Sequence, residues 1–578
     1  MSKYQVFIQD RAYTSWTIQD ETTNIQLNDE ERPLINPAQD KMFTKDVFTM
    51  NAENKVEIIY SPLKAMTEIP GVLVLESNKT YGRTENKKRL LYKCIPDDKH
   101  LPPFLIPYEV QLGFSKVTKN KYVIFKFDSW KDKHPHGILV QTLGNIDNLE
   151  IFYEYQLYCR SLHISISKFI NNARERIEKR PNEEHISHIF RHPDFKIEDR
   201  RTKHYVFTID PEGSLDFDDG FSIQKIHGGQ HRVSVYIANV YFWLETFGLW
   251  KSFSKRVSTI YLPDRRRPML PTILSESLCS LQKQQDRFAF AMDVIIDSNG
   301  KIVPNTISFK NVLINVEKNY VYEDHKMVTS DKHYRKLFDV SYMMDTSIKN
   351  SHDVVAHWMV MMNSLCGDYM AVNKFGIFRS SAFLNKSRAD IIDETICEDT
   401  RRVIRLWNNA SGQYMIYNGE QDHTHEVMNL KSYIHITSPI RRLIDLLNQM
   451  LMFDKLGLVK QVSKEAREFL SSWMDQIEYV NTSMRSIRKI QTDCELVHRC
   501  FTDPEIMKRE HTGVIFDKIL ISNNTFSYMV YLEDIKLLSR ITCREELSNY
   551  TKTRFKTYLF EDEDKIKKKI RLHIVNDV

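Results

Sequence analysis

Four aspartates lie close together in the segment YVFTIDPEGSLDFDDGFSI, at Asp210, Asp216, Asp218 and Asp219. A β-branched and aromatic run predicts a strand that ends at Asp210, and a second strand is predicted from Phe221. Carboxylates at this density repel one another and shift toward protonation unless cations compensate their charge. Hard oxygen ligands suit Mg²⁺, or alternatively Mn²⁺, and two such ions about 3.5–4 Å apart can activate water and stabilise the departing oxygen in phosphodiester hydrolysis. The residue types therefore match metal-dependent nuclease chemistry.

An acidic surface loop and a calcium site are the alternatives for this segment. In a surface loop, the aspartates would only cap turns of the backbone. An EF-hand requires glycine at the sixth position, but counting from Asp216 places Gly220 fifth and Phe221 sixth, so the spacing excludes an EF-hand. Residues 221–226, the HGGQ turn and HRVSVYI predict a β-hairpin, which favours a rigid site over a mobile loop.

A second segment, YIHITSPIRRLIDLLNQMLMFDKLG, predicts a helix that begins with Ser438 as its N-cap and ends at Gly457. Pro439 would take the first helical position, and apolar residues recur along one face. Arg441 and Arg442 would then lie in the first turn, where the helix dipole disfavours cations. A bound phosphate would resolve this conflict, and so would pairing of both arginines with carboxylates of a neighbouring segment.

The elements that would position these motifs follow a coarse pattern along the chain. Short apolar runs separated by turn residues, between about residues 55 and 165, predict strands that close a small barrel. Strand patterns dominate from about 205 to 300 and long helical patterns after about 350, which predicts an α+β domain. Strand-like pieces return near the C-terminal end. The whole is therefore expected to be a multidomain α+β protein.

The overall composition is that of a globular protein without a strong bias toward one class of partner. The 578 residues carry a formal net charge of only +5, so any RNA path must be a local basic lining. The eight cysteines form no CxxC pair, which predicts reduced thiols in a cytoplasmic or nuclear protein. No apolar run approaches the ~18 residues of a membrane helix, and the N-terminal segment is too acidic for a signal peptide, so we expect no membrane partner.

Three separated blocks carry a resemblance to a known family: TIDPEGSLDFDDGFSI, STIYLPDRRRPMLPTILSESLCSLQKQQDRFAFAMDVII and YIHITSPIRRLID. Together they resemble the RNB family of exoribonucleases, which comprises the ribonuclease II/R group and its eukaryotic exosome-associated relatives. The resemblance implies a central RNB catalytic domain between N-terminal cold-shock-type OB barrels and a C-terminal OB-type RNA-binding barrel. The implied domains are a shortened first OB-like barrel at 1–62, a second cold-shock-type OB barrel at 63–165, a linker at 166–204, the RNB catalytic domain at 205–505 and the C-terminal barrel at 506–578.

The resemblance also implies a function, namely Mg²⁺-dependent hydrolysis of single-stranded RNA from its 3′ end to nucleoside 5′-monophosphates. The enzyme would be a monomer that can bind accessory protein partners. The four aspartates would hold Mg²⁺ and the attacking water, and Arg441, with Arg442 beside it, would neutralise the scissile phosphate. Tyr261 matches a tyrosine that contacts RNA near its terminus, and Tyr322 matches one that senses the ribose. An ordinary core tyrosine is the alternative for each.

Some residues depart from the family's pattern. His357, in AHWMVMMN, replaces a usual glutamate at a position linked to recognition of the 2′-hydroxyl, and it is an RNA-binding candidate on that ground. Asn239, Leu443 and Asn448 also replace common residues, and none of them is one of the four aspartates. Two alternative functions follow: a catalytically silent RNA-binding scaffold with the RNB fold, and an exonuclease with relaxed discrimination between RNA and DNA.

Overall fold

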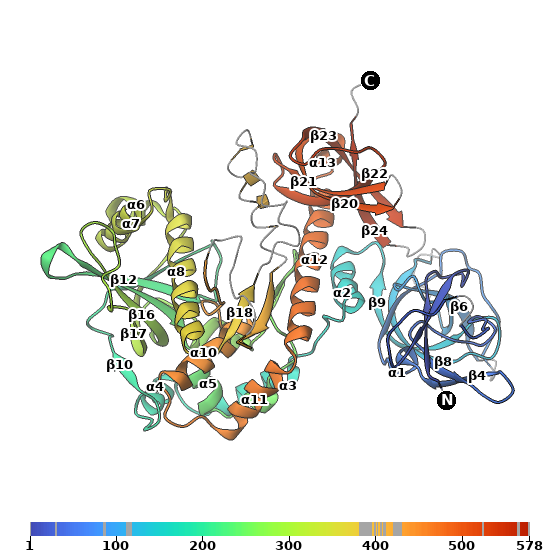
Figure 1. Ribbon diagram of the computed structural model, residues 1–578, viewed down its shortest axis with the longest axis horizontal. Coiled ribbons are helices and arrows are strands. Elements are labelled where there is room, and N and C mark those ends of the chain that lie inside the picture. The colour runs from blue at the N-terminus through green and yellow to red at the C-terminus, as the bar shows by residue number, and fades with distance from the viewer. Residues whose placement is uncertain are drawn as a thin grey trace. The chain divides into compact units, whose positions relative to one another are not determined.

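The structure of the protein, a computed structural model, divides into two compact units. It describes residues 2–28, 32–84, 88–110, 118–380, 396–397, 400–401, 403–404, 407, 412–419, 430–522, 525–562 and 567–575. The first unit comprises Met1–His163, Leu262–Asp264 and Lys489–Val578, and the second comprises Ile164–Tyr261 and Arg265–Arg488 (Figure 1). The acidic segment and both arginines of the second motif belong to the second unit.

The first unit begins with two small β-domains. In the first domain, four antiparallel strands form a sheet in the order β2-β1-β3-β4, and β1 to β4 span Tyr4–Ile8, Trp16–Asp20, Val47–Met50 and Val56–Tyr60. After the short helix α1 (Pro62–Ala65), five strands close into a barrel in the order β5-β6-β7-β9-β8. Strands β5 to β9 span Ile69–Leu73, Leu90–Pro96, Phe104–Tyr108, Lys121–Ser129 and His136–Asn145. The closed barrel confirms the small barrel expected from the short apolar runs, although the first of these runs, Val56–Tyr60, belongs to the preceding sheet.

The first unit also contains a C-terminal β-domain, introduced by helix α13 (Glu505–Lys508). Its sheet has the order β22-β21-β20-β23-β24, and its core includes Ile515, Val530 and Phe555. Strands β20 to β24 span His511–Ser522, Thr525–Leu532, Leu537–Cys543, Lys552–Asp562 and Lys567–Ile574. Together with the N-terminal β-domains, this arrangement confirms the fold class expected from the resemblance.

The second unit is built on a six-stranded sheet with the order β10-β17-β11-β12-β13-β16. Because β16 also pairs with β17, the strands from β17 to β16 form a closed ring. Strand β10 spans Ile197–Asp199, β11 Val206–Asp210, β12 Asp219–Lys225, β13 His231–Ala238, β16 Asp286–Ile296 and β17 Ser308–Val321. The predicted hairpin is confirmed, since β12 pairs antiparallel with β13 and places Ser222 opposite Ser234. Its turn uses Gly228 and Gly229, both at positive φ, which glycine adopts at little cost.

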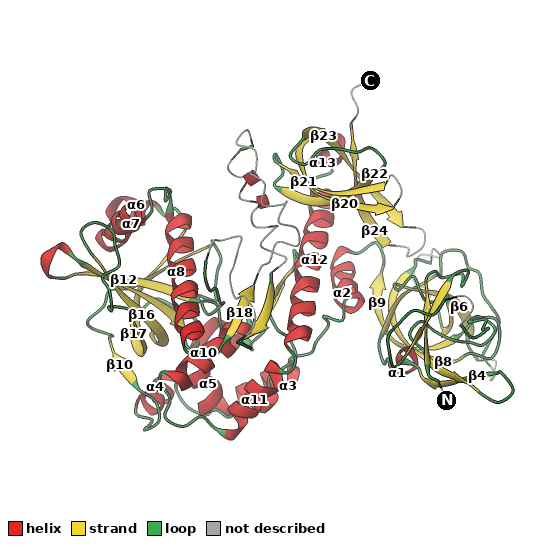
Figure 2. Ribbon diagram, viewed as in Figure 1, coloured by secondary structure: helices red, strands yellow, loops and turns green. Residues whose placement is uncertain are grey.

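The long helices of the second unit follow this sheet in the chain, which agrees with the α+β expectation (Figure 2). Two helices, α3 (Ser167–Ile177) and α4 (Asn182–Phe190), precede the sheet, and the short α5 (Tyr241–Thr246) follows β13. The later helices are α6 (His325–Ser330), α7 (Lys332–Met344), α8 (Ser351–Val372), α10 (Leu443–Lys455), α11 (Lys464–Met474) and α12 (Ile477–Thr502), of which α12 belongs to the second unit only up to Arg488. Within the described ranges, none of the helices combines the length and apolar character that crossing a bilayer requires.

Candidate active site

The four aspartates gather where two neighbouring strands of the sheet meet a loop. Asp210 is the last residue of β11 and Asp219 is the first residue of β12, and these strands are antiparallel neighbours. Asp216 and Asp218 lie in the connecting loop, whose backbone is fixed by a hydrogen bond of 2.8 Å from Ala238 N to the Asp218 carbonyl oxygen. The sheet therefore brings the predicted carboxylates to one edge.

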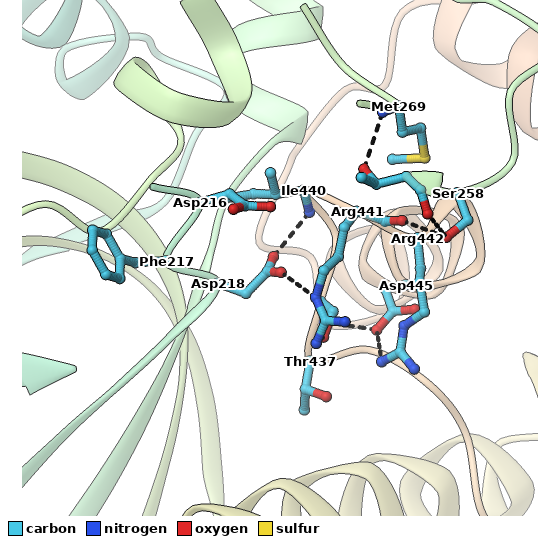
Figure 3. Close-up of polar contacts among 12 residues, drawn as sticks. Asp216, Phe217, Asp218, Ser258, Met269, Thr437, Ile440, Arg441, Arg442 and Asp445 are labelled. Atoms are coloured by element: carbon cyan, nitrogen blue, oxygen red, sulfur yellow. Dashed lines mark hydrogen bonds and ion pairs between the residues drawn. The ribbon is translucent and has the colours of Figure 1, made fainter. Parts of the chain in front are cut away.

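Asp218 is the most deeply buried of the four aspartates. Its side chain is only 3% exposed, its Oδ1 accepts a hydrogen bond of 3.0 Å from Ile440 N, and its Oδ2 lies 3.1 Å from Nε of Arg441 (Figure 3). Burial raises the pKa of Asp218 to about 7, against the opposing effect of the Arg441 charge. A carboxyl group in this state can hold or release a proton near neutral pH.

Asp210 and Asp219 are partly buried residues, and one carboxylate oxygen of each is fully buried. The Oδ2 atom of each meets no hydrogen-bond partner among the residues that the structure describes. Burial raises the pKa of both carboxyl groups, and the charge of Asp210 adds to the effect on Asp219. Two buried carboxylate oxygens without partners are suited to a divalent cation, since Mg²⁺ is commonly held by one or two carboxylates together with substrate phosphates.

Asp216 has a different environment from the other three. Its Oδ1 lies 2.6 Å from Nη1 of Arg266, and its Oδ2 is 3.4 Å from the hydroxyl group of Tyr261. In the part of the chain that is described, no three His, Cys, Asp or Glu side chains are grouped closely enough to hold a metal by themselves. Asp216 and Asp218 thus face arginines, whereas one buried oxygen of Asp210 and one of Asp219 meet no described hydrogen-bond partner.

The second motif departs from the predicted helix. Helix α10 begins at Leu443, five residues after the expected N-cap Ser438, so the prediction that Arg441 and Arg442 lie in a first helical turn is wrong. The backbone of this segment pairs instead with the stretch before β14 (Ile260–Tyr261), since Thr259 N donates to the Arg441 carbonyl oxygen at 3.0 Å. A hydrogen bond of 2.9 Å from Arg442 N to the Ser438 carbonyl oxygen closes the turn before α10, so Arg441 and Arg442 directly precede the helix.

The two arginines of the motif contact different carboxylates. Arg441 faces Asp218, whereas Nη2 of Arg442 lies 2.9 Å from Oδ1 of Asp445, a fully buried side chain. The predicted alternative, pairing of both arginines with carboxylates of a neighbouring segment, holds for Arg441 only, because Asp445 belongs to the same segment as Arg442. Arg441 remains 43% exposed and Arg442 20% exposed, so Arg441 is the better placed of the two to reach a bound phosphate.

The remaining candidates differ in their distance from this site. The backbone N–H of Tyr322 donates to the Asp210 carbonyl oxygen at 3.1 Å, and its ring stacks on His352 with centroids 3.6 Å apart. Burial and the charges of Asp219 and Asp210 raise the pKa of Tyr322 to about 12. Tyr261 contacts Asp216 directly. Both tyrosines are thus brought to the aspartates.

His357 is not brought to the aspartates by any described contact. It lines a cavity of about 540 Å³ together with Asp345 and Asp353, and the described lining includes none of the four aspartates. The sequence reasoning also missed Arg266 and Glu276. Arg266 is one of three consecutive arginines in LPDRRRP, and nothing in that run distinguishes which of them faces a carboxylate.

Comparison with known proteins gives matches over parts of the chain. The RNB domain family matches residues 198–337, and the Dis3-like cold-shock domain 2 family matches residues 91–155. DIS3-like exonuclease 2 of Schizosaccharomyces pombe is 32% identical over 230 residues, which is 37% of this chain and 24% of that protein. Ribonuclease R of Aquifex aeolicus is 30% identical over 190 residues, which is 32% of this chain and 26% of that protein. The matches thus span about a quarter of each of these relatives.

Solved structures show a likeness in fold over most of the chain. RNase R of Mycoplasma genitalium, solved in complex with ribose-methylated single-stranded RNA, matches with a TM-score of 0.68 and 16% identity, covering 99% of this chain and 100% of that one. Yeast Ssd1, described as a pseudonuclease, matches with a TM-score of 0.58 and 14% identity, covering 84% of this chain and 66% of that one. At these identities the likeness concerns the fold alone.

Proposed function

We propose that this chain, whose residues 198–337 match the RNB domain family, is a member of that family and a 3′→5′ exoribonuclease dependent on Mg²⁺ or Mn²⁺. Its substrate would be single-stranded RNA and its products nucleoside 5′-monophosphates. The contact between Asp218 and Arg441 carries this proposal, since it places a guanidinium group that can bind phosphate beside the cluster of four aspartates.

The burial and hydrogen bonds of each aspartate indicate its role in the reaction. Asp210 and Asp219 would hold the cation through their unpartnered buried oxygens. When bound, the cation would lower the pKa of water and polarise the phosphoryl oxygen. Asp218 accepts two fixed hydrogen bonds and can exchange a proton near neutral pH.

The arginine and the tyrosines would act on the RNA itself. The exposed N–H groups of Arg441 are available to a phosphate oxygen on which charge develops during the reaction. Tyr261, in a strand, and Tyr322, directly after β17, lie close to the aspartates and would offer aromatic surfaces near the reacting end. Stacking is available to every base, so the enzyme would accept any sequence but require a single strand.

A labelled-RNA assay tests the direction and the chemistry together. Single-stranded RNA with a 5′ label, incubated with the protein and Mg²⁺, should yield a ladder that shortens from the 3′ end and releases nucleoside 5′-monophosphates. Addition of EDTA should stop the reaction. Internal fragments carrying new 3′ and 5′ ends, or full activity in EDTA, would contradict the proposal.

A catalytically silent RNA-binding scaffold is the second candidate, since the fold is also that of the pseudonuclease Ssd1. Four closely spaced carboxylates repel one another, and a scaffold has no physical need to keep them. RNA binding without turnover in either Mg²⁺ or Mn²⁺ would favour the scaffold. The replacement at His357 motivates a matched DNA oligomer in the same assay, because equal rates on RNA and DNA would indicate relaxed discrimination.

A further inference from the structure

The loop that carries Asp216 is held by one segment, residues 260–281. The hydroxyl group of Ser280, which is fully buried, donates to the Leu215 carbonyl oxygen at 2.8 Å and accepts from Phe217 N at 3.0 Å. Leu281 N donates to the Phe217 carbonyl oxygen at 3.0 Å. The backbone on both sides of Asp216 is therefore fixed, and the direction of its side chain is narrowly constrained.

The same segment supplies the partners of the Asp216 side chain. Strands β14 (Ile260–Tyr261) and β15 (Arg266–Arg267) form a two-stranded ribbon in which Tyr261 and Arg266 are directly opposite each other. The hydroxyl group of Tyr261 donates to Oδ2 of Asp216 and Nη1 of Arg266 donates to Oδ1, so both oxygens have a protein donor. The Asp216 side chain is 12% exposed, and at that burial an ion pair is screened less than at the surface.

Arg266 is in turn held by Glu276. Nη2 of Arg266 lies 2.6 Å from Oε1 of Glu276 while Nη1 binds Asp216, so the guanidinium group bridges two carboxylates. Glu276 lies in a π-helical turn, Leu274–Leu278, a conformation that is rare and often occurs at functional sites. A planar guanidinium fork is suited to this bridging, whereas a lysine ammonium group is a point charge.

We propose that Arg266 is a positioning residue that keeps Asp216 out of the cation's coordination sphere and thereby sets the affinity of the site for divalent cations. This inference rests on the proposed cation site at Asp210 and Asp219. The fixed positive charge of Arg266 opposes the binding of a divalent cation beside the carboxylates, and it offsets the negative charge of Asp216. Without Arg266, Asp216 would be a free anion in the same loop, and the cation would bind more tightly.

Binding of Mn²⁺ to the full chain, followed by electron paramagnetic resonance in the absence of RNA, tests the inference. Arg266→Gln should lower the Kd for Mn²⁺ about tenfold, because one opposing charge is lost. Arg266→Lys should stay within about threefold of the wild type in Mn²⁺ affinity, since it keeps the charge, yet it should lose turnover because it cannot bridge Asp216 and Glu276. Arg265→Gln, which removes the same charge from the neighbouring exposed position, should stay within about twofold.

The outcomes separate this inference from the proposed function. If the wild type binds no Mn²⁺, the cation site itself is wrong and both fall. If the wild type binds Mn²⁺ but Arg266→Gln leaves its Kd unchanged, or Arg265→Gln shifts it equally, the role of Arg266 is overturned and the cation site stands. A melting temperature for each variant shows whether it folds; if Arg266→Gln unfolds, the same charge comparison is made with Arg266→Met.

Discussion

Oδ2 of Asp218 lies 3.1 Å from Nε of Arg441, although 223 positions separate the two residues in the chain. A second contact, from Ile440 N to Oδ1 of the same carboxylate, comes from the residue before the arginine. The acidic loop and the Ser438–Arg442 turn are thus joined through a single side chain (Figure 3). Substitutions on either side of this contact should change the chemistry more than the fold.

Asp218→Asn should lower kcat at least about 100-fold while leaving the Kd for RNA close to that of the wild type. The change keeps the shape of the side chain but removes the charge that faces Arg441 and the group that exchanges a proton. Single-turnover cleavage and filter binding measure the two quantities separately. Asp339→Asn, at an exposed position of α7, is the matched control and should behave as the wild type. Retained turnover by Asp218→Asn would refute the role assigned to Asp218.

Arg441→Lys should lower kcat by about 10- to 100-fold, because an ammonium group cannot contact Asp218 and a phosphate with the geometry of a guanidinium fork. Melting temperature should change little, since Arg441 is 43% exposed. Rapid-quench kinetics at saturating RNA gives kcat directly. A loss confined to KM would show that Arg441 contributes only to RNA binding.

Arg442→Ala should act on stability, in contrast to Arg441. It removes the cation that faces the fully buried Asp445 and leaves that carboxylate only uncharged donors such as Ser438 N, and an uncompensated buried charge costs about 3 kcal/mol of the free energy of unfolding. Urea unfolding followed by tryptophan fluorescence measures this loss. The double variant Arg442→Met with Asp445→Leu removes both charges and should recover most of the stability. If the single variant is as stable as the wild type, the pair is not structural.

Cation affinity should rise with pH between about 6 and 8, by tenfold or more. The pKa values of Asp210 and Asp219 are raised by burial, so protons occupy part of these groups below neutral pH, and a cation must displace them. Binding should therefore release protons, and the affinity should be lost as pH falls. Calorimetry of Mn²⁺ binding in two buffers with different ionisation enthalpies measures the protons released. A Kd that is independent of pH would show that other groups hold the cation.

The acidic motif was predictable because its information is local. The alternation of Phe221 to Ile226 and Val233 to Ile237 predicts the hairpin of β12 and β13. The antiparallel pairing of β12 with the preceding strand β11 then brings Asp219 beside the strand end that carries Asp210. The buried barrel strands were found for the same reason, since side chains alternate along any strand that has one face in a core.

The predicted helix start at Ser438 was wrong because the local sequence favours a helix there, whereas tertiary hydrogen bonds decide the structure. Ser438 followed by Pro439 is a good helix start, yet the structure begins α10 at Leu443 and uses the preceding turn to pair with residues 257–259. Hydrogen bonds to residues 257–259, which are far away in the sequence, cannot be predicted from the spacing of residues within one segment. Only the folded chain could therefore show this turn to be non-helical.

The amino-acid sequence by itself determined which residue types carry the chemistry and that the acidic residues meet at one edge of a sheet. The tertiary structure alone decided how they are used: Asp210 and Asp219 keep buried oxygens without described partners, whereas Asp216 and Asp218 are taken by Arg266 and Arg441. The physical reason is that spacing along the chain sets which side chains share a strand or loop. Which charge faces which depends on contacts between segments far apart in the sequence.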